Sequence, residues 1–120
     1  MTPVNSTARL IAHLGARLAG VPVHGEVPAT RPPRFVTVER VGGPQDRLGD
    51  HPLFAVQAWA DTKARAALLA DETAEAVRAW IRAPEVADVV VSSLYSFPDP
   101  DSRQARYQLT VSASLMRAVH

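Results

Sequence analysis

The sequence predicts an α+β fold: a single domain over residues 1–120, with an antiparallel or mixed four-stranded sheet and two helices packed on one face of it. Three observations predict this fold. Two segments carry apolar residues at helical spacing, and four segments are rich in β-branched and aromatic residues. These segments follow one another as helix, strand, strand, helix, strand, strand (α-β-β-α-β-β). A proline-rich extended arm over residues 20–34 separates the first helix from the first strand.

The first helix is predicted over residues 5–19. Asn5 or Ser6 can cap it, because a side-chain oxygen at that position accepts from an unpaired backbone N–H of the first turn. Gly20 and the following Pro22 are typical of a helix C-terminus. The apolar stripe of this helix consists of Ile11, Leu14 and Leu18.

The arm over residues 20–34 contains the run VPVHGEVPATRPPR. Its prolines exclude a helix and disfavour a central strand, because proline has no backbone N–H to donate. A short edge strand at Val21–His24 is the regular element we expect in it. Loops of this length are uncommon in compact domains and are often functional.

The first strand is predicted over residues 34–41, RFVTVERV, because β-branched residues dominate it. Successive side chains of a strand point to opposite faces of the sheet. Val36 and Val38 should therefore face one way, and Phe35 and Thr37 the other.

The second strand and the second helix follow without a long break. A connection rich in glycine, aspartate and proline over residues 42–52 leads to a strand over residues 53–60, which is apolar on both faces and therefore central. Asp61 or Thr62 can cap a long helix that reaches about Arg82. Its predicted buried stripe is Ala66, Leu69, Ala70, Thr73, Val77, Trp80 and Ile81.

The sequence closes with a long β-hairpin. Its strands are predicted over Ala87–Phe97 and Arg103–Arg117, joined by the turn-forming residues 98–102. Apolar and polar residues alternate in the last strand, so one of its faces should be buried and the other polar. The apolar set is Tyr107, Leu109, Val111, Ala113 and Leu115, and the polar set is Arg106, Gln108, Thr110, Ser112 and Ser114.

Composition excludes several classes of protein. The chain has 13 basic and 12 acidic residues, a balance that argues against a polybasic nucleic-acid binder. It has no cysteine, so it has no disulfide framework, thiolate zinc site or cysteine nucleophile. No apolar run approaches the roughly 20 residues that span a bilayer, and no secretion signal is recognisable. We therefore expect synthesis in the cytoplasm and no membrane partner.

No constellation of catalytic or metal-binding residues stands out. His24 and Glu26 could bind a metal or perform acid–base chemistry, but a solvated loop accounts for both. Asp99 and Asp101 suit Asx-turn positions better than a metal site. We expect no cofactor and no enzymatic activity. The histidines, none spaced as a metal ligand set, are His13, His24, His51 and His120.

Charged residues of both signs gather in the first hairpin region. Clustered arginines are typical of interfaces or phosphate contacts, but the acidic residues among them cancel the field. Salt bridges between subunits fit this mixture better than DNA does, and a simple solvated surface fits it about as well. The residues singled out are Arg31, Arg34, Arg40, Asp46, Arg47 and Asp50.

Several short motifs also form an ordered set along the chain. They are Val27–Pro28, Arg31–Pro32, Arg34–Val36, Arg40, Gly42–Gly43, Trp59–Ala60, Phe97–Pro100 and Arg106–Tyr107. This set resembles the tail terminator (tail completion) proteins of long-tailed phages of actinobacteria, and the resemblance covers about residues 20–115. Pro98 occupies the variable position of the family's F-x-DP motif.

The resemblance implies a structural virion protein and no enzyme. Proteins of this family assemble as rings, typically hexameric, on the last ring of the tail tube, where they stop tube polymerisation and offer the joining surface to the head connector. The implied partners are further copies of the chain, the tail tube protein and a connector or neck protein. The implied location is the head–tail junction of the virion, after synthesis in the host cytoplasm.

A ring of this kind would use the residues already singled out. Its subunits need complementary patches, which the six mixed-charge residues could supply as the subunit or tail interface. The polar face of the last strand could line the lumen through which DNA passes. The lumen-facing residues would be Arg106, Gln108, Thr110 and Ser112.

Other functions remain open from the sequence. One is a neighbouring neck or head-completion protein of similar size. Another is a small-ligand-binding or regulatory α+β domain, with a pocket between sheet and helices near Trp59, Trp80 and His51. A third is a hydrolase or metal enzyme that uses His24, Glu26 or His51.

Overall fold

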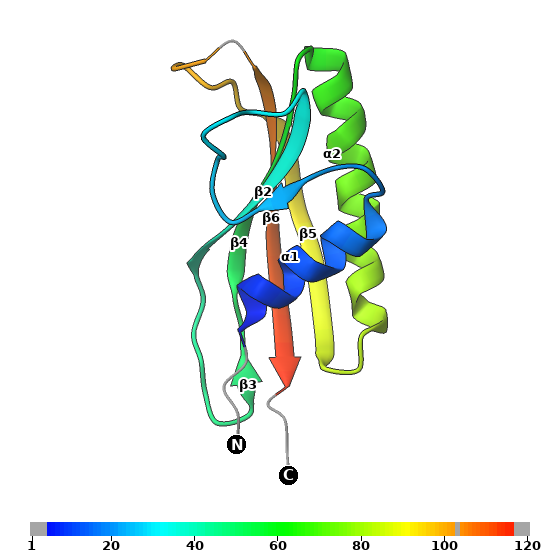
Figure 1. Cartoon of the computed structure of the whole chain (residues 1–120). Coiled ribbons are helices and arrows are strands. Elements are labelled where there is room, and N and C mark those ends of the chain that lie inside the picture. Colours follow the sequence, from blue (N-terminus) through cyan, green and yellow to red (C-terminus); the bar gives the residue numbers. More distant parts are fainter. Residues whose placement is uncertain (1–4, 103, 117–120) are drawn as a thin grey trace.

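The predicted α+β architecture is confirmed by the computed structural model, which describes residues 5–102 and 104–116. Both helices lie on one face of a twisted sheet, and α1 crosses in front of the strands while α2 runs alongside them (Figure 1). The elements are α1 (Ser6–Arg17), β1 (Val23–His24), β2 (Arg34–Gly42), β3 (Gly49–Asp50), β4 (Leu53–Ala60), α2 (Lys63–Arg78), the 3-10 helix η1 (Ala79–Arg82), β5 (Val86–Ser96) and β6 (Ala105–Met116).

The described residues form a six-stranded mixed sheet. The long strands β2, β4, β6 and β5 lie side by side in that order, and each pairs antiparallel with its neighbour. These are the four strands that the sequence predicts. Two strands of two residues complete the sheet. The strand β1 pairs parallel with β2, and β3 pairs antiparallel with the end of β6, on the same side of β6 as β4.

One core lies between the helices and the sheet. Val36 and Val38 of β2 point into it together with Leu14 of α1 and Val77 of α2, and all four are fully buried. The predicted facing of β2 is therefore correct. From β6 the core receives Leu109, Val111, Ala113 and Leu115, which confirms the alternation read from the sequence.

The helix caps follow from the local sequence. Asn5 caps α1 by accepting a hydrogen bond from the backbone N–H of Ala8 at 3.0 Å, and Thr62 caps α2 by accepting from Arg65 at 3.2 Å. Each is one of the two residues considered for its helix. None of the helices in the described ranges is long and apolar enough to cross a membrane.

The buried stripe of the second helix is predicted correctly except for Ile81, whose exposed fraction is 46%. The cause is a change of helix type, because α2 gives way to η1 at Ala79. A 3-10 helix has three residues per turn instead of 3.6, so the spacing that buries Trp80 turns Ile81 toward solvent.

The predicted edge strand of the arm is shorter than expected, since it includes only Val23 and His24. The last strand begins at Ala105; the predicted ends Arg103 and Arg117, like His120, lie outside the described residues. The β5–β6 hairpin is present, with an irregularity between Val91 and Ser93.

Candidate functional site

The face of the sheet opposite the helices is the candidate functional surface, which we call the open face. Both helices pack against the other side, so this face is not covered by α1 or α2. Its side chains alternate with the core residues along each long strand. From β2 to β5 it includes Phe35, Thr37, Gln57, Trp59, Arg106, Gln108, Thr110, Ser112, Ser93 and Tyr95.

Side-chain hydrogen bonds cross the open face from β2 to β5. Thr37 Oγ1 donates to Gln57 Oε1 at 3.4 Å, and Gln57 Nε2 donates to Gln108 Oε1 at 2.8 Å. Gln108 Nε2 in turn donates to the hydroxyl of Tyr95 at 2.5 Å. Gln57 and Gln108 are direct cross-strand partners, so the sheet register fixes this ladder. It ties the four long strands together without any charged group.

The four residues predicted to line a lumen all lie on this face. Gln108 belongs to the ladder, Thr110 accepts a hydrogen bond from the hydroxyl of Ser93 at 2.9 Å, and Ser112 is exposed. Arg106 lies at the end of the row and is engaged by neighbouring aromatic rings. The centre of the open face thus offers amides and hydroxyls, which interact weakly with a phosphate backbone compared with arginine and lysine.

At one end of the open face, Trp59 is 1% exposed although no helix covers it. The ring of Phe35 stacks on the indole with centroids 5.3 Å apart. The indole Nε1 of Trp59 donates to Thr37 Oγ1 at 3.1 Å. Two guanidinium groups lie over the indole, that of Arg31 at 5.2 Å and that of Arg106 at 4.9 Å from the ring centroid. These cation–π contacts shield the ring from water.

The arm is fastened to this end of the sheet through Arg31. Its guanidinium lies 3.5 Å from the carboxylate of Asp99 and donates to the Oγ of Ser102 at 3.3 Å. Gln104 reinforces the link by donating to the carbonyl oxygen of Pro32 at 3.2 Å. The arm and the loop between β5 and β6 therefore form one connected unit.

The residues of the family-like motifs meet here. Arg31, Trp59 and Arg106 come from three motifs and Phe97 and Asp99 from a fourth, yet each of the five contacts a residue of another motif. Arg106 also donates to the carbonyl oxygen of Phe97 at 2.7 Å. In this chain the motifs therefore specify an internal junction between arm, sheet and hairpin.

Arg40 and Asp50, two of the residues singled out for an interface, form an ion pair within the chain. Arg40 donates to the Asp50 carboxylate at 2.6 Å and to the carbonyl oxygens of Gly42 and Gly43. The hydroxyl of Ser6 donates to the same carboxylate oxygen at 2.5 Å, which joins the start of α1 to the sheet. Burial favours a higher pKa for Asp50, but the hydrogen bonds from Arg40 and Ser6 outweigh it, and the pKa is lowered.

Asp46 organises the connection between β2 and β4. Its carboxylate accepts from the backbone N–H groups of Gly49 and Leu48, which lower its pKa, and its other oxygen lies 3.0 Å from His51 Nε2. His51 Nδ1 lies 2.9 Å from the Ser114 hydroxyl. A Cβ on Gly49 would collide with the carbonyl oxygen of Leu115, so glycine is required where this loop approaches β6.

Asp46, His51 and Ser114 are the residue types of a nucleophilic triad, but their arrangement differs from that of one. In the hydrolytic triad the base reaches serine through Nε2 and the aspartate holds Nδ1. Here the two ring nitrogens are exchanged. We assign the trio a structural role, which is to fix the loop to β6.

The remaining candidates lie apart from one another. Arg34 borders a surface pocket with Leu68 and three prolines, and Arg47 is exposed in the loop. The six mixed-charge residues thus occupy four places: the arm junction, the ion pair with α1, the β2–β4 loop and the pocket beside α2. Ser6 was considered only as a helix cap, and no sequence pattern indicated its contact with Asp50, because the two residues lie 44 positions apart.

The alternative sites are not assembled. Trp80 packs against Phe54 on the helix side of the sheet, whereas Trp59 lies on the open face and His51 in the loop, so the three do not line one pocket. His24 and Glu26 border a surface pocket of the arm. Within residues 5–102 and 104–116, no group of three histidine or acidic residues could hold a metal ion.

Comparison with solved structures identifies a chain of similar fold. A chain in a structure described as the virion of a native gene transfer agent (GTA) particle shares the fold, with a TM-score of 0.60. The match covers 93% of this chain and 90% of that chain at 16% sequence identity. No protein-family model and no curated protein matches the sequence.

Proposed function

We propose that the chain is a structural subunit of a phage-like virion, and more specifically a tail terminator that assembles as a ring on the end of the tail tube. The observation that carries the proposal is the likeness to the GTA virion chain, which extends over nearly the whole of both chains. At 16% identity that likeness concerns the fold. The more specific proposal of a tail terminator comes from the motif set of residues 20–115.

The open face supports a lumen in such a ring. A channel for DNA must be wetted but must not retain a polyanion, and affinity for DNA grows with the number of phosphates that cations neutralise. The hydrogen-bonded row of Gln57, Gln108 and Tyr95 presents polar groups without charge. Arg106, the cation of this row, is held by the rings of Trp59 and Phe97.

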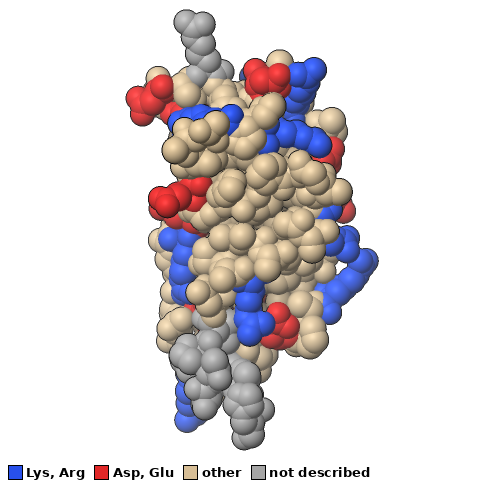
Figure 2. Space-filling view, viewed as in Figure 1, with Lys and Arg blue, Asp and Glu red and all other residues tan. Residues whose placement is uncertain are grey.

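The opposite side of the chain suits the outside of a ring. On the face that carries α1, Figure 2 shows basic and acidic side chains interspersed, with no broad area of one sign. Such a surface keeps a virion component soluble without attracting nucleic acid. The charge count of 13 basic and 12 acidic residues agrees with this distribution.

Tube assembly in the presence of the chain tests the proposal. Tail tube protein polymerised alone should give tubes of uncontrolled length, and added chain should cap them and shorten the length distribution measured by electron microscopy. A gold-labelled chain should sit at one tube end. Tubes that grow to the same lengths with unlabelled ends would contradict the terminator role.

A neighbouring neck protein is the second candidate, because the GTA likeness names the whole particle and not a position in it. The two roles differ in their first binding partner. A terminator should bind purified tubes without any head, whereas a neck component should bind DNA-filled heads through their connector and leave tubes unlabelled.

A further inference from the structure

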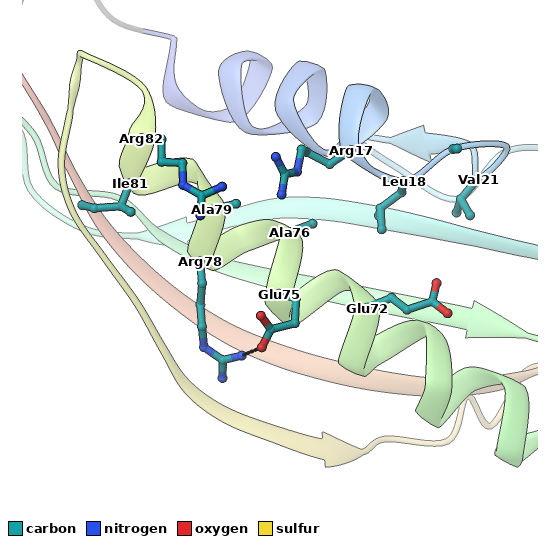
Figure 3. Close-up of a pocket in the computed structure, with 11 residues that line it drawn as sticks. Arg17, Leu18, Val21, Glu72, Glu75, Ala76, Arg78, Ala79, Ile81 and Arg82 are labelled. Carbon is teal, nitrogen blue, oxygen red and sulfur yellow. Dashed lines mark hydrogen bonds and ion pairs between the residues drawn. The ribbon is translucent and has the colours of Figure 1, made fainter.

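A surface groove of 650 Å³ lies between the C-terminal ends of the two helices (Figure 3). Leu18 at the C-cap of α1, Ala76 of α2 and Ala79 of η1 contribute apolar lining. Ile81 adds an exposed apolar side chain. Arg17 borders the groove from α1 and Arg82 from η1. The groove is therefore apolar at its base and charged at its border, where Glu72, Glu75 and Arg78 join the two arginines.

Arg17 and Arg82 have no partner for their charge among the described residues, which distinguishes them from Arg78, the third arginine of the groove. Arg78 is paired with Glu75 at 2.9 Å, the contact that Figure 3 marks with a dashed line. No ion pair or hydrogen bond of the Arg17 or Arg82 side chain occurs in the part of the chain that the structure describes. Glu72 lies toward the other end of the groove from Arg82 in the same view.

The loop over residues 97–102, which we call the acidic tip, has the complementary chemistry. Phe97 is 42% exposed. Asp101 is exposed, and its carboxylate makes no hydrogen bond or ion pair with any of the described residues. The tip is already ordered, since the Asp99 side chain accepts from the backbone N–H of Asp101 at 3.1 Å and is anchored by Arg31. An ordered loop loses little conformational entropy when it binds.

Groove and acidic tip lie on opposite flanks of the molecule. Figure 1 has the tip at the upper left, and the ends of α1 and α2 that border the groove on the right. A ring needs a head-to-tail contact between two different patches, one on each flank of every subunit. A tip and a groove that lie on the same flank could not propagate in this way.

We infer that the groove receives the acidic tip of a neighbouring copy of the chain, with Asp101 between Arg17 and Arg82 and Phe97 near Ile81. This contact would be the head-to-tail interface of the ring, so the inference rests on the proposed function and names the residues that close the ring. It assigns the interface to residues other than Arg40 and Asp50, whose charges are used within the subunit.

Charge exchange between two variants tests the contact. Arg82→Glu and Asp101→Arg each place like charges at the interface, and each should weaken self-association at least about tenfold, measured by sedimentation at fixed salt. Mixing the two variants should restore assembly, because the tip of one then meets the groove of the other at every contact of an alternating ring. Lys63→Glu, with the same charge change at the exposed start of α2, should assemble like the wild type.

The outcomes separate the inference from the proposed function. Wild-type assembly that both variants retain would overturn the contact and leave the ring in place. Variants that lose assembly and are not rescued by mixing would overturn it as well, because the inferred contact depends on opposite charges at positions 82 and 101. A wild-type chain that forms no ring at any concentration would overturn the contact together with the self-assembling ring.

Discussion

The guanidinium of Arg31 lies 5.2 Å from the indole centroid of Trp59, and this contact joins the proline-rich arm to one end of the sheet. The same side chain also forms an ion pair with Asp99 and a hydrogen bond with Ser102 in the loop of the β5–β6 hairpin. One arginine thus holds three segments that are far apart in sequence. The arm is an integral part of the fold before any partner binds.

Removal of this side chain should loosen the arm. Arg31→Ala should lower the free energy of unfolding by about 1 kcal/mol, the combined size of an exposed cation–π contact and partly exposed polar contacts. Limited proteolysis within residues 25–33 should become faster, as read by mass spectrometry. Arg47→Ala, which removes an exposed arginine from another loop, should change neither quantity; equal effects of both variants would refute the role of Arg31.

Trp59 should be more sensitive than an open-face position suggests. Trp59→Ala should cost about 3–5 kcal/mol, since it removes a large side chain that is 1% exposed. Trp59→Phe keeps a ring for Phe35 to stack on but loses the hydrogen bond to Thr37, so we expect a smaller loss of about 1 kcal/mol. Urea unfolding followed by circular dichroism measures both, and a nearly neutral Trp59→Ala would contradict the shielded geometry.

The Asp50 carboxylate should contribute to acid sensitivity. Its pKa is lowered in the folded chain, so the folded state favours the ionised form more than the unfolded state does. The resulting stability is fully present above the unfolded pKa near 3.8 and is lost as the pH falls through the lower folded value. Unfolding free energies measured from pH 7 to pH 3 should therefore decline at the acid end.

Asp50→Asn isolates this effect. The variant should lose about 2–4 kcal/mol at pH 7, because Arg40 and Ser6 keep donors in place without a carboxylate to accept from them. It should also show a shallower decline between pH 5 and pH 3 than the wild type. Parallel pH curves for both proteins would show that Asp50 is not a titrating contributor to stability.

A new cation on the open face should act on DNA only if that face lines a channel. Ser112 is exposed, so Ser112→Arg should change the free energy of unfolding by less than about 0.5 kcal/mol. In an assembled ring it should add salt-dependent retention of linear DNA in a filter-binding assay. Leu68→Arg, on the outer face of α2, adds the same charge elsewhere and should not; equal retention by both variants would argue against a lumen at β6.

Periodicity predicted the elements of this fold well because the burying face of each one repeats at a fixed interval. The β6 alternation ending in Val111, Ala113 and Leu115 is a direct example. Ile81 departs from its prediction because a 3-10 turn changes the interval within one helix. Such a change depends on packing at the helix end, which a local pattern does not contain.

The candidate surfaces were less predictable, since they depend on contacts between distant residues. Arg31 meets Trp59, and Ser6 meets Asp50, across separations that the sequence alone cannot pair. The polar residues Gln108 and Thr110 were predicted to share one sheet face, and they do. The sequence could not indicate which charged residues of the first hairpin region pair within the chain. Arg40 and Asp50 form an internal ion pair, whereas Arg47 is exposed in the loop.

The mass of the purified chain in solution tests the central claim most directly. Size-exclusion chromatography with light scattering should give a discrete species near six times the 12.9 kDa of the chain, and negative-stain images of that species should show rings with a central hole. A protein that stays at 12.9 kDa at every concentration, and also when tail tubes are added, would contradict the account of a ring-forming virion subunit.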